Sequence, residues 1–152
     1  MNIKKTVLLL LLSINTFTFA QEKTYTIKEV EKIAIYPGCD ETLDNNEQIK
    51  CLNNKLLSDL FSQLSDSVNR MTASNRSGHF KTFNTFVINS NGDFVDIVSN
   101  GDRQLSDAVK NAFKKLNKIQ TKTNKKIIPA KNSDGENVNL KFSIPVSVSI
   151  SK

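Results

Sequence analysis

The stretch that decides the fold is NVNLKFSIPVSVSI, which spans residues 137–150. Every even-numbered residue from Val138 to Ile150 is apolar, and every odd-numbered residue is polar or, at Pro145, a proline. Alternation with a period of two is typical of a β-strand that has one buried face and one solvated face. The apolar face of this strand needs a cover, so the rest of the chain must supply one.

Two amphipathic segments can supply that cover. The first is predicted to be a helix from about residue 46 to about residue 68, and Asp44 with Glu47 fits a capping box at its start. The second has the cleanest helical stripe in the chain, and Asp102 precedes it as a possible N-cap. The apolar positions are Ile49, Leu52, Leu56, Leu60, Phe61, Leu64 and Val68 in the first segment, and Leu105, Ala108, Val109, Ala112, Phe113 and Leu116 in the second.

A β-hairpin is predicted between the two helices. Residues 80–89 and 94–98 read as strands, and an Asn-Gly pair between them is a strong hairpin signal. The polar segments 69–78 and 121–126 are predicted to be loops. Residues 21–32 form an N-terminal lead, which is either a short edge strand or disordered. Together the elements predict an α+β fold: a two-layer sandwich with a three-stranded antiparallel sheet, a β-β-α-β core and an extra N-terminal helix.

The first 20 residues have the pattern of a secretory signal peptide. Lys4 and Lys5 precede a short apolar run, and small residues ending at Ala20 form a cleavage site before Gln21. An uncleaved membrane anchor is the alternative, but the apolar run is shorter than the roughly 20 residues that span a bilayer. We therefore expect an exported chain, periplasmic or secreted, without a stable membrane anchor.

The cysteines and the charges narrow the class of protein further. Cys39 and Cys51, the only cysteines, are expected to form one disulfide in an oxidising compartment. A metal-binding pair is disfavoured because the chain has no CxxC motif and only one histidine. The excess of basic residues lies in residues 110–131, with few arginines or aromatic residues among the lysines. This pattern favours a solvated basic face over a nucleic-acid site.

No catalytic constellation is visible in the sequence. His79 has no cysteine, serine or carboxylate at a motif spacing, which favours a structural role. Asp40 and Glu41 could form an acid–base pair, but they lie at a helix start, where capping explains them. A calcium loop of the EF-hand type would need a central glycine, which is absent from the acidic residues 40–47. We expect neither enzymatic activity nor a cofactor or metal.

The motifs also form an ordered set. An apolar run ends in Pro37-Gly38-Cys39, Cys51 falls at a helix start, a hairpin covers residues 86–97, and Phe142-Ser143-Ile144-Pro145-Val146 ends the set. The helix at residues 105–116 and Pro129 with the Gly135 turn lie between them. In this order the motifs resemble the exported TonB C-terminal-like domains common in Bacteroidota, in a soluble variant without an anchor. The resemblance covers roughly residues 33–150.

The resemblance implies a domain of residues 33–152 that is not an enzyme. It implies binding of an extended segment of an envelope protein or outer-membrane receptor by β-augmentation, the addition of a strand to a sheet edge. Carried over residue by residue, the partner-binding edge is Asn139, Leu140, Lys141, Phe142 and Ser143. Pro145 has no N–H, so pairing should be best before it. Homodimerisation through the same edge is a further expectation. The alternative function is a small secreted inhibitor or structural binder that acts through the 69–78 loop.

Overall fold

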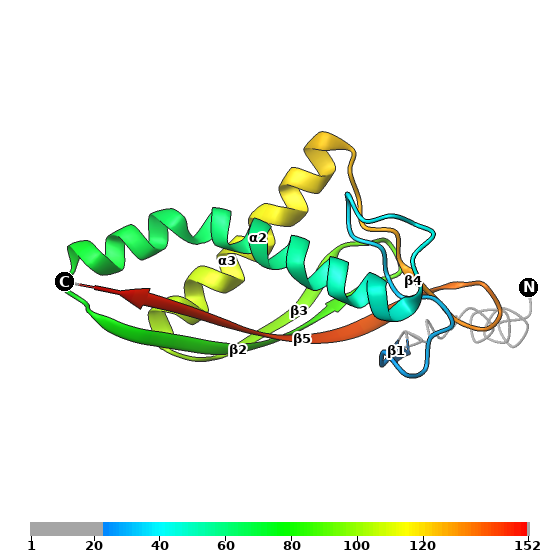
Figure 1. The fold of residues 1–152 in the computed structure, drawn as a ribbon, viewed down its shortest axis with the longest axis horizontal. Helices are drawn as coiled ribbons and strands as arrows, with labels where there is room; N and C mark the ends of the chain where they lie inside the picture. The colour runs from blue at the N-terminus through cyan, green and yellow to red at the C-terminus, as the bar shows by residue number, and fades with distance from the viewer. Residues whose placement is uncertain (1–22, 152) are drawn as a thin grey trace, which may run out of the picture.

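The computed structural model describes residues 23–151 and shows an α+β fold with two helices (Figure 1). The predicted signal peptide lies outside the described residues, so its cleavage stays a prediction. The elements, in chain order, are β1 (Thr24–Tyr25), α2 (Asn45–Ala73), β2 (Gly78–Ile88), β3 (Phe94–Gly101), α3 (Arg103–Thr123), β4 (Ala130–Lys131) and β5 (Asn137–Ile150).

The sheet is built around β2, which lies between β5 and β3. β2 and β5 are antiparallel along their whole shared length, from the pair Gly78 and Ile150 to the pair Ile88 and Leu140. Two short strands are added to β5: β1 runs parallel to it and β4 antiparallel. The α+β class is therefore confirmed, but the expected three-stranded, wholly antiparallel sheet is wrong. The sheet has five strands, and strands of two residues are too short to show any periodicity in the sequence.

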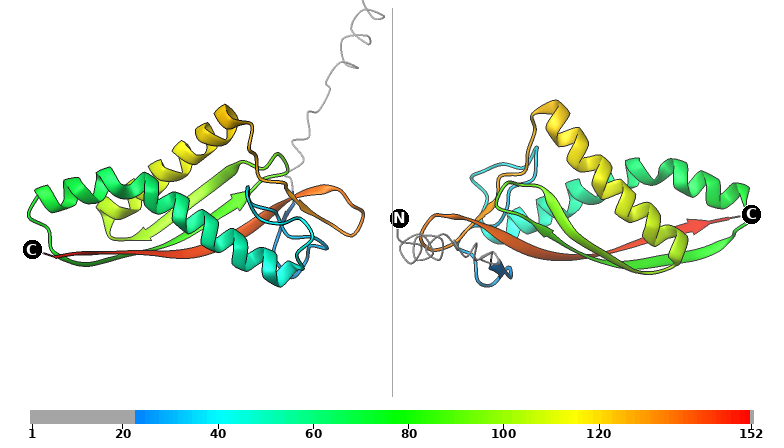
Figure 2. Two further views of the ribbon diagram at one scale, coloured as in Figure 1. Left: turned by 45° about the horizontal axis from the view of Figure 1, so that its top comes forward. Right: turned by 180° about the vertical axis from the view of Figure 1, so that it is seen from behind.

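Both helices lie on the same face of the sheet, as Figure 2 shows. α2 packs on β5 and on α3, whereas α3 packs on β3 and β2. The predicted N-caps are confirmed, because the carboxylate of Asp44 accepts from the Glu47 N–H and that of Asp102 from the Leu105 N–H. Each cap satisfies a helix-end donor that has no partner within the helix.

Both predicted loops are shorter than the sequence suggested. α2 continues through the polar residues 69–73, because Met71 is completely buried and anchors the last turn. β2 then begins at Gly78, which leaves only residues 74–77 as the connection. Residues 121–123 likewise belong to α3 and not to a loop. Burial of Met71 outweighed the polar composition at the end of α2, whereas residues 121–123 are exposed and α3 ends only at Asn124, which is in the left-handed conformation.

The core forms where the apolar row of β5 meets the helices. An aromatic cluster lies at its centre, with ring centroids 4.8 Å apart for Phe86 and Phe113 and 5.8 Å apart for Phe86 and Phe142. Burial of a phenylalanine side chain stabilises a fold by about 1.5–3 kcal/mol. The helices therefore provide the cover that the alternation in residues 137–150 requires.

One fully buried polar group interrupts this apolar layer. The side-chain amide of Asn84 donates to the Thr82 hydroxyl at 3.1 Å and to the Ile144 carbonyl at 3.2 Å. Its carbonyl oxygen accepts from the Ser99 hydroxyl. We call Thr82, Asn84 and Ser99 the buried polar trio, and it links β2 to both neighbouring strands.

The segment before α2 is tied to the rest of the domain. Isolated bridges pair Lys32 with Lys131 and Ile35 with Ile128. The predicted disulfide is present between Cys39, in the Pro-Gly turn, and Cys51, in the second turn of α2. Val30 of the N-terminal lead is buried in the core with Ile33, Ala34 and Tyr36, so part of the lead packs with the domain.

Candidate functional site

One side of β5 is the longest stretch of the described sheet that has no neighbouring strand. β5 lies between β2 and β1, but β1 covers only Asn139 and Leu140. Among residues 23–151, no strand pairs with this side of β5 from Lys141 to Ile150. We call residues 141–150 the outer edge; it runs along the molecule beside α2 in Figure 1.

The structure divides the predicted partner-binding residues into two groups. Asn139 and Leu140 already pair with Thr24 and Tyr25 of β1. The side-chain oxygen of Asn139 also accepts from the Ser90 N–H at 2.9 Å. The other three residues, Lys141, Phe142 and Ser143, lie on the outer edge. The side of β5 that lacks a neighbouring strand therefore starts after Leu140 and runs past Pro145, and binding at the predicted residues stays a prediction.

The two faces beside the outer edge differ in character. Toward the helices, Phe142, Ile144 and Val146 are buried. Toward solvent, Lys141, Ser143, Pro145, Ser147 and Ser149 are exposed. Pro145 stands opposite Phe83 of β2 in the register and lies in a strand that forms the sheet edge, where a proline is tolerated.

The other edge of the sheet, β3, is short and irregular. The β2–β3 register shifts between Thr85 and Val87, and Asp96 has a φ of 50°. A bulge and a charged residue are two of the devices by which natural sheets discourage strand addition. The outer edge of β5 is therefore the longer and more regular of the two free edges.

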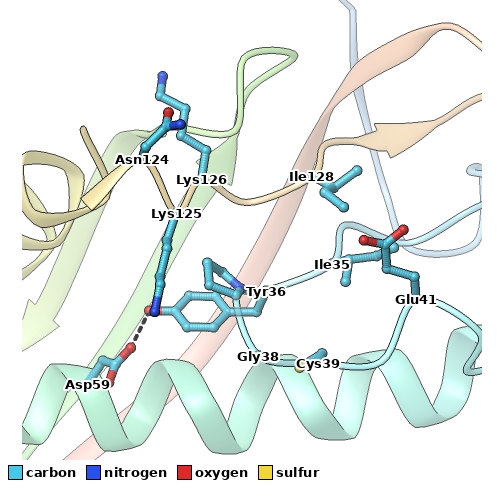
Figure 3. Close-up of a pocket in the computed structure, with 11 residues that line it drawn as sticks. Ile35, Tyr36, Gly38, Cys39, Glu41, Asp59, Asn124, Lys125, Lys126 and Ile128 are labelled. Atoms are coloured by element: carbon cyan, nitrogen blue, oxygen red, sulfur yellow. Dashed lines mark hydrogen bonds between the residues drawn. The ribbon is translucent and has the colours of Figure 1, made fainter. Parts of the chain in front are cut away.

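A cavity of about 540 Å³ lies on the helix side of the molecule, between residues 35–41, α2 and residues 124–128 (Figure 3). Within it the Tyr36 hydroxyl donates to the Asp59 carboxylate at 2.8 Å. Burial, and then the hydrogen bond to Asp59, raises the pKa of Tyr36 far above its usual value, so the phenol stays neutral. Lys125, Lys126 and Glu41 also line the cavity. The cavity thus offers a neutral phenol and charges of both signs but no activated nucleophile, since Cys39 in its wall is in the disulfide.

The candidate acid–base pair is separated by its contacts. Glu41 lines the cavity, but the Asp40 carboxylate accepts from the N–H and the hydroxyl of Thr42. These two hydrogen bonds lower the pKa of Asp40. Asp40 therefore closes a local turn, as its place before a helix suggested.

His79 has a partner that sequence spacing could not reveal. Its Nδ1 lies 2.8 Å from the hydroxyl oxygen of Ser149, because the two residues face each other in the β2–β5 register. Both side chains are exposed. Among the described residues, no carboxylate is hydrogen-bonded to the His79 ring. A Ser–His pair without an orienting acid or a closed pocket lacks the arrangement of a hydrolase site.

The described residues contain neither a metal-binding cluster nor a membrane-spanning helix. No group of three or more His, Cys, Asp or Glu side chains in residues 23–151 is placed to hold a metal ion. Neither α2 nor α3, the helices in that part of the chain, is long and apolar enough to cross a membrane.

Comparison with known proteins adds one distant likeness. No protein-family model and no curated protein matches the chain. Among solved structures, the chain is similar to the solution NMR structure of the TonB C-terminal domain from Helicobacter pylori. The two are 20% identical over 74% of this chain and 88% of the other, with a TM-score of 0.38. A likeness of this degree carries no argument about function.

Proposed function

We propose that the chain is a non-enzymatic interaction module that binds an extended segment of an envelope or outer-membrane protein by β-augmentation. The partner strand would pair with residues 141–150. The observation that supports this proposal is the outer edge of β5, which no strand among the described residues pairs beyond Leu140. Backbone hydrogen bonds along such an edge supply affinity that is largely independent of the partner's sequence.

The size of the outer edge suits a peptide. At about 3.3 Å per residue it offers roughly 30 Å of strand. About half of its residues direct N–H and C=O groups outward, and each net hydrogen bond contributes about 0.5–1.5 kcal/mol. The pairing of β1 with Asn139 and Leu140 supports the proposal, because it places a strand on the same side of β5 directly before the outer edge.

The disulfide is consistent with an exported protein. Disulfides such as Cys39–Cys51 persist mainly in oxidising compartments outside the cytosol. We therefore place the protein in the periplasm or outside the cell, after cleavage of the predicted signal peptide. The alternative function through a 69–78 loop loses its basis, because most of that segment belongs to α2.

The test places a photo-crosslinking amino acid at Ser147, which is exposed on the outer edge. The mature chain is incubated with a detergent-solubilised envelope fraction, and the crosslinked segment is then made as a synthetic peptide. We expect that peptide to slow amide hydrogen exchange along residues 141–150. The same crosslinker at Lys122, exposed on α3, is the matched control. Protection confined to other residues, or equal crosslinking from both positions, would count against the proposal.

A further inference from the structure

An apolar flank of α2 is exposed where no described element covers it. Phe61 is 43% exposed although it is aromatic, and Leu57 and Val68 are only partly buried against the core. These three residues lie on one side of the helix, because their spacings of four and seven residues bring them to similar angles at about 100° per residue. We call Leu57, Phe61 and Val68 the α2 flank.

The α2 flank faces away from α3. Gln63, Ser67 and Arg70 of α2 line a hollow together with residues of α3, so they mark the side that faces α3. At about 100° per residue, the α2 flank lies roughly 130° around the helix axis from them, with the buried Leu64 between the two sides. Since α2 packs on β5 and α3 packs on β2 and β3, the side away from α3 overhangs the outer edge.

The α2 flank and the outer edge also lie at the same level along the molecule. α2 begins beside the start of β5, because Asn45 accepts from the Ile33 N–H and the neighbouring Lys32 pairs with Lys131, which pairs with Asn137. Their far ends also coincide, since β2 follows α2 directly and opens on the pair between Gly78 and Ile150. Figures 1 and 2 show the two elements running side by side.

The rise per residue places individual residues at matching heights. At about 1.5 Å per helical residue and 3.3 Å per strand residue, Phe61 is about level with Ile144 and Val68 with Val148. Val148 is itself only partly buried. A strand added to the outer edge would therefore direct every second side chain toward the α2 flank.

The opposite face of such a strand would meet a surface that carries two exposed lysines. β5 contains no carboxylate, and its one charge is Lys141. Lys81, on the adjacent strand β2, is exposed and stands opposite Ser147 in the register. Acidic or hydroxyl side chains on the partner would complement this surface.

We infer that the outer edge and the α2 flank form one groove, which selects an extended peptide with apolar residues alternating with acidic or hydroxyl residues. The apolar side chains enter between β5 and the α2 flank, and the others lie on the open face near Lys141. The alternation follows from the period of a strand. The inference rests on the proposed β-augmentation and adds the sequence preference of the partner.

The test is a selection from a phage-displayed library of random linear peptides against the full mature chain. We expect the enriched sequences to alternate apolar with acidic or hydroxyl residues. Phe61→Ser should weaken their binding about tenfold, because an apolar contact of this size is worth about one factor of ten. Ile119→Ser is the matched control, since Ile119 is 41% exposed on α3. Lys141→Glu should weaken the binding of the acidic sequences to a similar degree.

The outcomes separate the two proposals. Enriched peptides that protect residues 141–150 from exchange but bind the Phe61→Ser and Ile119→Ser variants equally would overturn the groove and leave β-augmentation standing. Peptides that bind without protecting those residues would overturn both, as would a selection that enriches nothing. A concentration-dependent dimer that Phe61→Ser abolishes would make a second copy of the chain the occupant and would overturn the peptide.

Discussion

Breaking the buried polar trio should cost more stability than removing it as a whole. The perturbation is Asn84→Ala. Asn84 is completely buried and makes three side-chain hydrogen bonds, to Thr82, Ser99 and the Ile144 carbonyl. Alanine leaves those partners buried and short of a hydrogen bond, and it also leaves a small void.

The structure sets the magnitude. Three net hydrogen bonds at about 1 kcal/mol each, with about 1 kcal/mol for the void, predict a loss of about 3–4 kcal/mol in the free energy of unfolding. For a domain of roughly 130 residues, this corresponds to a fall in Tm of about 10–15 °C. The triple variant Thr82→Val, Asn84→Leu and Ser99→Ala leaves no side-chain polar group without a partner. It should therefore stay within about 1 kcal/mol of the original protein.

The assay is urea denaturation of the oxidised protein near neutral pH, followed by far-UV circular dichroism. Asn100→Ala is the matched control, because Asn100 is exposed on β3. Its effect should stay within about 0.5 kcal/mol. The reasoning is wrong if Asn84→Ala costs less than about 1 kcal/mol, or if the triple variant is as unstable as the single one.

Three further perturbations test separate parts of the fold. Replacing Cys39 and Cys51 by serine should lower the free energy of unfolding by about 3 kcal/mol, and dithiothreitol should lower the urea midpoint of the original protein but not that of the variant. Gly92→Ala should cost about 3 kcal/mol or more, because φ is +80° and the added Cβ would lie 2.1 Å from a carbonyl oxygen, whereas Gly135→Ala, at +78° in open space, should cost only about 1–2 kcal/mol by thermal melting. The salt bridge to an arginine, and then a backbone N–H, lowers the pKa of Asp102. The original protein should therefore exceed Asp102→Asn in stability by up to about 1 kcal/mol above about pH 4, and lose this advantage as the pH falls through the lowered pKa; an advantage that persists in acid would contradict this.

Most of the fold could be predicted from the hydrophobic periodicity of the sequence and from its helix-capping residues. The alternation in residues 137–150 and the stripes of the two helices predicted the elements that meet in the core. The caps at Asp44 and Asp102 could also be predicted, because a side-chain oxygen at the N-cap position accepts a hydrogen bond from a backbone N–H in the first turn of the helix. The two-residue strands β1 and β4 could not be predicted from the sequence, because they are too short to show a hydrophobic pattern. They form only because β5 lies beside them.

The candidate site could be predicted from the sequence only in part. The sequence marks β5 as a strand, but which of its sides is open depends on where β1 docks, and no local pattern encodes that pairing. For the same reason, the contact between His79 and Ser149 could not be predicted. The two residues are far apart in the chain and meet only through the β2–β5 register. The polar residues 69–73 read as a loop because a single buried methionine is a weak helical signal.

The long pairing of β2 with β5 sets the order in which the fold can be completed. It pairs Gly78 with Ile150 and Ile88 with Leu140. The two strands are therefore separated in the chain by α3 and by most of the second half of the sequence. Contacts of such high sequence separation slow folding, because a long loop must close before any of them forms. During synthesis the β2–β3 hairpin and both helices are made before β5. Their apolar faces therefore stay uncovered until the last residues of β5 have been added, and in that interval the nascent chain is most exposed to aggregation and most dependent on a chaperone.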